Sequence, residues 1–426
     1  MIEELHEKYK KCSSVSTDTR SISNGALFFA LKGPNFNANK LAEQALESGA
    51  KYVVIDDEQF KKDDRFILVD DCLNTLQQLA NYHRKQLDIP FIAITGSNGK
   101  TTTKELMREV LAQKYVVYAT LGNFNNHIGV PLTILSINES VEIAIIEMGA
   151  NKLGDIAQLC EIAAPTHGMI TNIGKAHVGN FGGFDNIIRA KSELYQYLIE
   201  NDGQVWINSN QEILANMSKR FNSPLFYPNR GDYYHAHFVE ATPYVLFETE
   251  NKKTVQSQLV GAYNFENIAA ALCVGKFFDV DEEKANEAIR NYLPSNNRSQ
   301  VIDRKSNTII MDAYNANPSS MEVAIDNFGK MKGERKVVVL GDMYELGEES
   351  DSEHERLGEI VAAQNFDHVF FCGKLIKLAL NTCPNALYFE EKKELGQALR
   401  QQKYQDTLML LKASRGIGLE TILEDI

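Results

Sequence analysis

Apolar and polar residues alternate along the middle of the chain in two different rhythms. Short, continuous apolar runs such as Phe91–Thr95, Val141–Glu147 and Met169–Ile173 are typical of strands that are buried on both faces. Longer segments with apolar residues at helical spacing, Thr102–Gln113 and Asp185–Leu198, lie between them. This alternation predicts parallel βαβ units, with helices covering both faces of a sheet.

The segments on either side repeat this rhythm in smaller units. Near the start, Ala26–Leu31 and Tyr52–Ile55 are strand-like, and Leu41–Gly49 has helical spacing and ends on glycine, a common helix stop. Further strand-like runs in the last part of the chain are Thr308–Met311, Lys336–Leu340, His368–Phe371 and Thr407–Leu411. Both flanking segments are therefore predicted to be α/β as well.

One part of the middle region departs from this rhythm. Tyr244–Glu248 and Thr254–Leu259 flank the polar turn 250–253, a pattern typical of a β-hairpin. We expect these antiparallel strands to extend the central sheet. Helical spacing returns over Phe265–Phe278, and the polar, proline-containing stretch Pro294–Ser299 is the best candidate for a linker.

These patterns predict an α/β protein of three domains, covering residues 1–85, 86–297 and 298–426. A chain of 426 residues is too long for one ordinary domain. The first domain is small, the second has a mostly parallel sheet, and the third has about 130 residues, a usual domain size.

Composition limits the class of partner. A hydrophobic fraction of 44% with 24% charged residues is typical of globular proteins with substantial cores. The net charge of −13 would repel a nucleic-acid backbone, and no basic patch offsets it. There is no run of about 18 apolar residues and no apolar signal-peptide region. We therefore expect a cytoplasmic protein with no integral membrane segment and no nucleic-acid partner. A monomer is also expected.

The cysteines are scattered along the chain. The six residues have no C-x-x-C spacing, which argues against a zinc site. A disulfide framework is also not expected in a chain of this size, because such frameworks are typical of small secreted domains. We expect reduced cysteines that mostly pack in the interior.

The segment between Phe91–Thr95 and the following helix carries the clearest chemical signal. Its glycines let backbone N–H groups converge on phosphate oxygens, and the helix N-terminus adds a partial positive charge. Lys100 supplies a full charge for the outer phosphates, and the Thr101 hydroxyl can bind Mg²⁺. Ile94 stands where the strict G-x-x-x-x-G-K-[ST] pattern has its first glycine, but the shorter G-x-x-G-K-T in this setting predicts an ATP-binding loop. The residues expected to contact the nucleotide are Gly96, Ser97, Asn98, Gly99, Lys100, Thr101 and Thr102.

Two further side chains follow predicted strands at their carboxyl ends, where open parallel sheets bind ligands. Glu147 ends the strand 141–147, and a carboxylate beside the phosphate loop suits the Mg²⁺ of a bound nucleotide. His177 follows the strand 169–173, but its local sequence does not distinguish a ligand from a surface residue. Lys191 lies in a helical pattern, and the residues around it predict an exposed lysine paired with a neighbouring glutamate.

Two asparagine-rich segments also attract attention. One is a predicted loop with Asn123, Asn125 and Asn126. Asparagines are common in turns, so these residues need have no role beyond forming the loop. Asn317 before Pro318 is a sound helix start, with the amide as N-cap and the proline in the first turn.

Several motifs, taken together, resemble those of the Mur ligase superfamily, the ATP-dependent amide ligases of peptidoglycan precursor synthesis. They are Glu147-Met148-Gly149-Ala150, the run 312–318 and the run 341–347. The resemblance extends from about Ser16 to Gly418, and it is closest to the branch that joins D-alanyl-D-alanine to UDP-N-acetylmuramoyl-tripeptide through an acyl phosphate. It implies an N-terminal domain that binds the UDP-muramoyl peptide, a central P-loop ATPase, and a C-terminal Rossmann-like domain that binds D-alanyl-D-alanine and closes on ATP.

The resemblance also implies a metal site and catalytic roles. Glu147 and His177 would hold magnesium together with Thr101, and two Mg²⁺ ions are expected. Lys191 matches a lysine that becomes carbamylated, a change that converts a cation into an anionic oxygen donor suited to Mg²⁺. The residues with implied catalytic roles are Lys100, His177, Lys191 and Arg298.

Contacts with the nucleotide and the substrates follow from the same resemblance. Asn267 matches the position that contacts adenine, Arg298 the arginine that reaches the ATP phosphates from the third domain, and Asp312 the carboxylate on the ribose. The implied substrate contacts are Thr19, Arg20, Lys32, Asn123, Asn126, Asn315, Asn317, Lys412 and Ser414.

Three alternatives remain at this point. A sibling ligase that adds the third amino acid, or a folylpolyglutamate-type ligase, is disfavoured by the run 315–318. A nucleotide-binding module without ligase activity is disfavoured by candidate residues spread over two domains. A relative that has lost catalysis is disfavoured by Lys100, Thr101, Glu147 and His177. The third residue of the tripeptide, meso-diaminopimelate or lysine, stays open.

Overall fold

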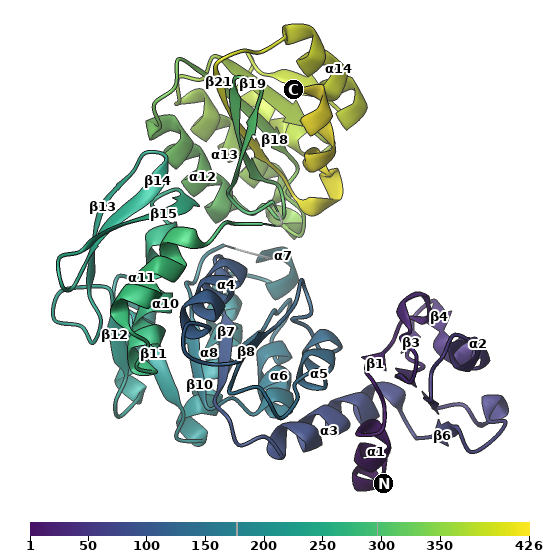
Figure 1. The fold of residues 1–426 in the computed structure, drawn as a ribbon. Coiled ribbons are helices and arrows are strands. Elements are labelled where there is room, and N and C mark those ends of the chain that lie inside the picture. The colour runs from purple at the N-terminus through teal and green to yellow at the C-terminus, as the bar shows by residue number, and fades with distance from the viewer. Residues whose placement is uncertain (176–177, 296) are drawn as a thin grey trace.

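The computed structural model describes residues 1–175, 178–295 and 297–426. Within them the chain forms three successive α/β units, so the predicted α/β class is confirmed. Figure 1 shows the first unit at the lower right, the central unit beside it, and the third unit at the top. Within the described residues, we find no helix with the length and apolar character needed to span a membrane.

The first unit is a small parallel sheet in the order β1-β2-β5-β6, with a short hairpin, β3–β4. Its strands are β1 (Val15–Ser16), β2 (Leu27–Phe29), β3 (Lys32–Gly33), β4 (Phe36–Asn37), β5 (Tyr52–Ile55) and β6 (Phe66–Leu68). Its helices are α1 (Ile2–Tyr9), α2 (Ala42–Glu47) and α3 (Cys72–Lys85). The strands predicted on β2 and β5 and the helix predicted on α2 are confirmed. Helix α2 stops near Gly49, whose φ of +109° suits glycine.

The central unit is built on a parallel sheet in the order β12-β11-β10-β7-β9-β8. Its strands are β7 (Phe91–Thr95), β8 (Val117–Ala119), β9 (Ile143–Glu147), β10 (His167–Ile170), β11 (Gln204–Asn208) and β12 (Leu225–Tyr227). Its helices are α4 (Lys100–Leu111), α5 (Gly129–Ile134), α6 (Asp155–Ala163), α7 (Val178–Phe181), α8 (Phe184–Glu200), α9 (Glu212–Met217), α10 (Asn264–Phe277) and α11 (Glu282–Asn291). The predicted parallel βαβ units are confirmed.

Every position of β7 and β9 is buried because helices cover both faces of this sheet. Alternate residues of β7 enter different cores. Phe91 and Ala93 pack with residues of α3, α6 and α8, whereas Ile92 and Ile94 pack with residues of α4 and α10. This explains why the strand has a continuous apolar run rather than an alternating pattern.

The predicted hairpin is present, but the expectation that it extends the central sheet is wrong. Strands β13 (Ala236–Ala241), β14 (Tyr244–Thr249) and β15 (Thr254–Val260) form a separate antiparallel sheet. Residues of β14 are alternately buried and half-exposed, so the sheet has only one face to bury. That face, including Val245 and Phe247, packs in the same core as α10. Helix α10 is consequently buried on almost every side.

The third unit is a sheet in the order β16-β17-β21-β18-β19-β20, parallel except for β16. Its strands are β16 (Gln300–Arg304), β17 (Asn307–Asp312), β18 (Arg335–Gly341), β19 (His368–Cys372), β20 (Leu387–Phe389) and β21 (Thr407–Lys412). Its helices are α12 (Pro318–Lys330), α13 (Ser350–Ala362) and α14 (Lys392–Gln402). The strands predicted on β17, β18, β19 and β21 are confirmed, and helices cover both faces of the sheet.

One predicted strand ends earlier than expected. The apolar run 169–173 predicts a strand throughout, whereas β10 ends at Ile170. The Thr171 hydroxyl and the Asn172 side-chain amide instead donate hydrogen bonds to the carbonyl oxygen of Asn98, at 2.6 and 3.0 Å. These polar groups support the phosphate loop.

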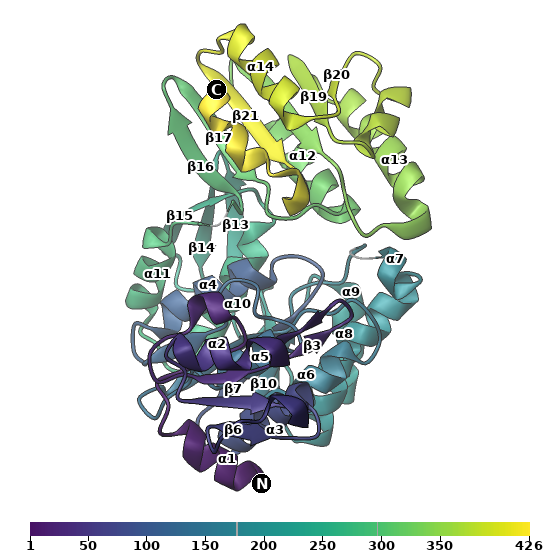
Figure 2. The ribbon, with the colours of Figure 1, turned by 90° about the vertical axis from the view of Figure 1, so that its right-hand side faces the viewer.

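The arrangement of the units leaves the first and third apart. Helix α3 of the first unit packs against α5 and α6 of the central unit. Figures 1 and 2 both show the first unit next to the central one and far from the third, with the two chain termini at opposite ends. The third unit instead meets the central one through β15, β16 and the pair formed by α7 and the short turn Gly347–Glu349.

Candidate functional site

The loop between β7 and α4 has a backbone that only glycine fits at two positions. Gly96 has a φ of +147°, and a Cβ there would lie 2.0 Å from the Thr171 hydroxyl oxygen. Gly99 has a φ of +78°, and a Cβ there would lie 2.5 Å from the side-chain oxygen of Asn267. Both positions therefore need glycine for conformation and for space.

The residues after β10 hold this loop in shape. The backbone N–H groups of Ser97 and Asn98 donate to the carbonyl and side-chain oxygens of Asn172, each at 3.0 Å. The Ser97 hydroxyl donates to the carbonyl of Gly174 at 2.9 Å. The loop and the N-terminus of α4 are thus fixed in advance, which lowers the entropy lost when a phosphate binds.

The Lys100 ammonium folds back over the loop. It donates to the carbonyl oxygens of Gly96 at 2.8 Å and of Ser97 at 3.3 Å. Burial lowers the pKa of Lys100, Glu147 opposes that change, and the guanidinium of Arg298 adds to it. A polyphosphate would relieve the repulsion between the two cations, so their proximity favours an anionic ligand.

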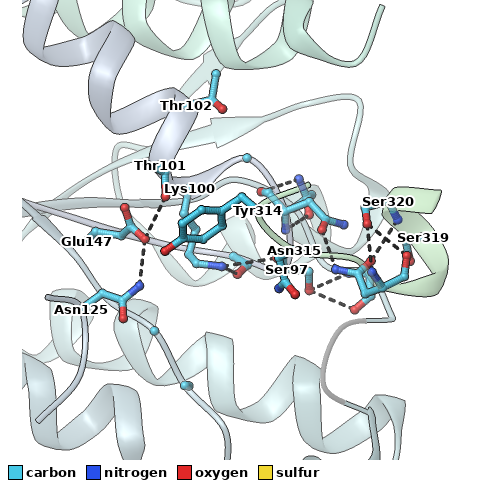
Figure 3. A pocket seen from close by; sticks show the side chains of 18 of the residues that line it. Ser97, Lys100, Thr101, Thr102, Asn125, Glu147, Tyr314, Asn315, Ser319 and Ser320 are labelled. Carbon is cyan, nitrogen blue, oxygen red and sulfur yellow. Dashed lines mark hydrogen bonds between the residues drawn. The ribbon is translucent and has the colours of Figure 1, made fainter. Parts of the chain in front are cut away.

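Glu147 ends β9, directly beside β7 in the sheet. Its Oε1 accepts hydrogen bonds from the Thr101 hydroxyl at 3.1 Å and from the Asn125 amide at 2.9 Å, as Figure 3 shows. Its Oε2 is buried and accepts no hydrogen bond from the described residues. A buried carboxylate oxygen of this kind, next to a hydroxyl, suits a hard cation that takes its remaining ligands from phosphate and water. The predicted loop asparagine Asn125 therefore does more than form a turn.

Lys104 places a buried positive charge next to the Glu147 carboxylate. Its side chain is 0% exposed, and its Nζ lies 3.5 Å from Glu147 Oε2, 3.1 Å from Glu105 Oε1 and 2.6 Å from the Thr120 carbonyl oxygen. Lys104 is not among the site residues predicted from the sequence. Its spacing with Met107 and Leu111 places it on the buried stripe of α4, and this signal could have identified it.

We predict that Lys104→Ala lowers the free energy of unfolding by about 3 kcal/mol, because it leaves a buried carboxylate without its cation. Urea denaturation at neutral pH measures the change. Glu109→Ala is the matched control on the same helix and is expected to cost less than about 1 kcal/mol, because Glu109 forms its ion pair with the partly exposed Arg108. Equal stability of Lys104→Ala and the parent would contradict the prediction.

Lys191 contradicts the prediction of an exposed, ion-paired lysine. Only 3% of its surface is exposed, because it shares the buried stripe of α8 with Ile187, Leu194 and Leu198. Burial, with the charge of Lys100 adding to it, lowers the pKa of Lys191 to about 7. No hydrogen bond or ion pair joins it to another residue within 1–175, 178–295 and 297–426. The nearby Glu193 instead accepts from the backbone N–H groups of Gly154 and Ala157.

The third unit contributes charged side chains to the same space. Asp312, at the end of β17, pairs with Lys412 and accepts from the backbone N–H of Ser299 at 3.2 Å. The guanidinium carbon of Arg298 lies 3.7 Å from the centre of the Tyr314 ring, and its Nε is buried without a hydrogen bond to the described residues. Figure 3 shows Tyr314 reaching toward Lys100, Thr101 and Glu147.

Asn317 joins the two units directly. It is the N-cap of α12, in a capping box with Ser320, and Pro318 lies in the first turn, so the predicted helix start is confirmed. Its side-chain amide also donates to the side-chain oxygen of Asn98 in the phosphate loop at 2.8 Å. The Ser319 hydroxyl beside it accepts from the backbone N–H of Lys175 at 2.9 Å.

These groups line one cavity of about 1270 Å³ between the central and third units. It brings together many residues that are far apart in sequence. The predicted site residues that line it are Gly96, Ser97, Asn98, Gly99, Lys100, Thr101, Thr102, Asn123, Asn126, Glu147, Lys191, Asn267, Arg298, Asp312, Asn315, Asn317 and Lys412. His177 lies outside the described residues. Ser414 does not line the cavity; it is buried, and its hydroxyl accepts from the backbone N–H of Tyr344 at 3.0 Å.

The predicted contacts in the first unit lie elsewhere. Thr19 and Arg20 line a separate cavity of about 550 Å³ in that unit. Lys32 does not line it, and its ammonium forms an ion pair with Asp56 at 2.8 Å. Within the described residues, no group of three or more His, Cys, Asp or Glu side chains is placed to hold a metal.

Three family models match successive parts of this chain. The model described as Mur ligase family, catalytic domain, matches residues 11–84. The Mur ligase middle domain matches residues 94–275, and the Mur ligase, glutamate ligase domain, matches residues 297–415.

Curated relatives are similar over nearly the whole chain. The UDP-N-acetylmuramoyl-tripeptide–D-alanyl-D-alanine ligase of Bacillus subtilis is 36% identical over 425 residues, 97% of this chain and 92% of the relative. The enzyme of the same name from Escherichia coli is 32% identical over 423 residues, 96% of this chain and 92% of the relative.

Solved structures share the fold and support the same assignment. MurF from Acinetobacter baumannii superposes with a TM-score of 0.88 at 29% identity, covering 100% of this chain and 98% of that one. MurF ligase from Thermotoga maritima in complex with ADP gives a TM-score of 0.86 at 28% identity, covering 98% and 97%. With a phosphate loop, a matched order of domains and curated relatives along nearly all of its length, this chain belongs to the Mur ligase family.

Proposed function

We propose that this protein binds ATP and joins D-alanyl-D-alanine to UDP-N-acetylmuramoyl-tripeptide, forming ADP, phosphate and a new amide bond. The observation that carries the proposal is the shared cavity, in which Lys100 of the phosphate loop and Arg298 of the third unit line the same space. The names of the curated relatives supply the substrates, and the ADP complex of the Thermotoga maritima relative supports the nucleotide. Together they favour peptidoglycan precursor synthesis.

The three units take separate roles in this proposal. Residues 1–85 bind the UDP-muramoyl peptide, 86–297 bind ATP, and 298–426 bind the dipeptide and close the site. The separate cavity of the first unit, lined by Thr19 and Arg20, supports a distinct substrate subsite there. The hydrogen bond between Asn98 and Asn317 supports closure of the third unit onto the ATP loop.

The first chemical step activates the substrate. An oxygen of the tripeptide carboxylate bonds to the γ-phosphorus of ATP while the bond from that phosphorus to the bridging oxygen breaks, which releases ADP and leaves an acyl phosphate. Carboxylate and phosphate repel one another, so cations must neutralise the assembly. Lys100 and Arg298 line the cavity from opposite units and supply that charge.

The second step forms the amide. The amine of D-alanyl-D-alanine attacks the acyl carbon, the tetrahedral intermediate collapses, the bond to the phosphate oxygen breaks, and phosphate leaves as the nitrogen loses a proton. Acyl phosphates react with water, so the site must exclude it while the amine docks. We assign this exclusion to the third unit, and its contact with the phosphate loop through Asn317 and Asn98 supports that role.

The residues present fit the magnesium that such a reaction uses. Thr101 and Glu147 are neighbouring oxygen donors, and Glu147 Oε2 is buried without a hydrogen bond from the described residues. A carbamate on Lys191 would add a further oxygen donor, and His177 is proposed as a ligand by family resemblance. When bound, Mg²⁺ neutralises phosphate charge and orients the γ-phosphate, and two ions are proposed.

Carbamylation of Lys191 is supported by its surroundings. Carbon dioxide reacts with a neutral amine, and burial lowers the pKa of this lysine to about 7, so a large fraction is neutral near pH 7. The carbamate is anionic and would face the charge of Lys100, which contributes to the lowered pKa. Modification therefore replaces a repulsive contact with an attractive one.

The proposed ligase function predicts how phosphate release depends on the substrates present. With ATP, Mg²⁺ and the correct UDP-muramoyl tripeptide, D-alanyl-D-alanine should raise phosphate release by at least about 100-fold over reactions without it, because amide formation removes the acyl phosphate. Free diamino acids and glutamate should not replace the dipeptide. Comparing the meso-diaminopimelate and lysine tripeptides in the same assay identifies the third residue. Preference for a free amino acid over the dipeptide would contradict the proposal and favour a sibling ligase.

A further inference from the structure

The cavity contains one arginine for which the reaction described above provides no role. Arg415 begins the short turn Arg415–Ile417, which two residues separate from the end of β21, and its exposed side chain lines the cavity. Its guanidinium carbon lies 5.3 Å from the centre of the Tyr314 ring. Among the residues that the structure describes, no carboxylate forms an ion pair with it.

The other cations of the third unit that face this cavity already have roles. Lys412 is paired with Asp312, and Arg298 is assigned to the phosphates. Asp312 at the end of β17 and Lys412 at the end of β21 are partners in the parallel sheet. Tyr314 follows the first strand and Arg415 follows the second, so both lie beyond the same edge of the sheet. Arg415 is therefore a cation held at the mouth of the site, on the unit assigned to the dipeptide.

Building on the ligase function proposed above, we propose that Arg415 binds the terminal carboxylate of the incoming dipeptide. The dipeptide carries its nucleophilic amine at one end and a carboxylate at the other, so a cation at the far end would fix the direction of binding. Arginine suits this task because its planar guanidinium can donate two parallel hydrogen bonds to a carboxylate.

The Tyr314 ring makes this cation a better anchor than a free surface arginine. An aromatic face attracts a guanidinium and restricts its rotamers, so less entropy is lost when the carboxylate binds. Arg298 lies over the same ring at 3.7 Å, so Tyr314 contacts both the arginine assigned to the phosphates and the one assigned to the dipeptide. Tyr314 would therefore help to position both the arginine that binds the ATP phosphates and the arginine that binds the dipeptide carboxylate.

Lys152 is the rival anchor. It also lines the cavity, but on the central unit, in the loop before α6. A lysine binds a carboxylate as a point charge, without the two-bond geometry of arginine. No aromatic ring holds the Lys152 ammonium within the described residues, whereas Tyr314 holds Arg415.

The test compares D-alanyl-D-alanine with D-alanyl-D-alanine amide, in which the terminal carboxylate is replaced by a neutral group. The parent protein should prefer the acid over the amide by about 10- to 100-fold in kcat/KM, the usual range for losing hydrogen bonds to a charged group. In Arg415→Gln that preference should disappear, mainly through a higher KM for the acid. Arg415→Lys should recover part of it, and the KM values for ATP and the UDP substrate should stay within about twofold.

Arg335→Gln is the matched control, since Arg335 is exposed at the amino end of β18 and does not line the cavity. Thermal melts confirm that each variant is folded. Arg415→Gln with the parental preference for the acid overturns the proposal, as does a Lys152→Gln variant that loses the preference when Arg415→Gln keeps it. A parent that releases no phosphate with the dipeptide instead contradicts the ligase function itself, so the two failures are distinguishable.

Discussion

Arg298→Ala is expected to lower kcat by about 1000-fold while the Kd for the UDP-muramoyl tripeptide changes by less than about twofold. An arginine that reaches transferring phosphate from another domain contributes on the order of 10³–10⁵ to kcat. Arg298 fits that description because it lines the cavity from the third unit, contributes to the lowered pKa of Lys100, and has a buried Nε without a hydrogen bond from the described residues. The first unit, which we propose binds the UDP substrate, lies far from the third unit, to which Arg298 belongs (Figure 1).

Single-turnover kinetics and calorimetric titration with the UDP substrate separate the two effects. Arg304→Ala is the matched control, because Arg304 lies on the neighbouring strand β16 and its ion pair with Glu424 is at the surface. Arg298→Lys should restore little, since an ammonium lacks the planar fork that contacts phosphate oxygens. Parental turnover in Arg298→Ala would rule out a role for this residue in phosphate transfer.

Lys191→Ala is expected to lower kcat by at least about 100-fold, equivalent to roughly 3 kcal/mol of transition-state stabilisation. The substitution removes the side chain that the proposal modifies to an oxygen donor, and it leaves a small apolar space in the buried stripe of α8. A short carboxylic acid such as acetate or propionate should restore part of the activity, because it can place a carboxylate in that space.

Acetate added to the parent is the control and should have no such effect. Lys191→Arg, which keeps a cation but cannot be carbamylated in the same way, should stay inactive with and without the acid. An unimpaired Lys191→Ala would contradict carbamylation as a requirement, and a loss that no acid reverses would indicate a packing role instead.

Because its pKa is lowered, Lys191 should make both carbamate formation and the stability of the protein depend on pH. Its pKa falls from an ordinary value of 10.5 to about 7, so the neutral amine that accepts carbon dioxide becomes more abundant as the pH rises through 7. Without modification, the unfolded chain binds more protons at this residue than the native protein between pH 7 and 10.5. The contribution of Lys191 to stability is therefore most unfavourable below pH 7 and is relieved as the pH rises above it. Carbon-13 NMR in labelled bicarbonate, from pH 6 to 9, detects the carbamate directly.

Local patterns predicted much of the fold. The continuous apolar run on β7 and the glycine stop after α2 depend on neighbours in sequence, and the structure confirms both. Asn317 and Pro318 are confirmed as a helix start for the same reason, since capping satisfies backbone groups within one turn. The hairpin β14–β15 was also predicted, but not the sheet to which it belongs. The hairpin belongs to a separate sheet because its one apolar face packs against α10.

The candidate site shows the same division. By itself, the sequence determined the phosphate loop, because glycines, Lys100 and Thr101 must be contiguous to surround a phosphate at a helix N-terminus. The sequence also placed Glu147 at a strand end beside this loop, whereas the roles of Arg298 and Asp312 came from family resemblance. All three residues line the cavity, which supports those roles.

Only the tertiary structure decided which charges are buried and which groups meet. Lys191 and Lys104 are ordinary helical lysines in sequence, and they are buried because α8 and α4 turn those faces toward the interior. The pairing of Tyr314 with Arg415 joins two segments that only strands β17 and β21 bring together. Burial and charge interactions depend on distance in space, and a sequence records distance only along the chain.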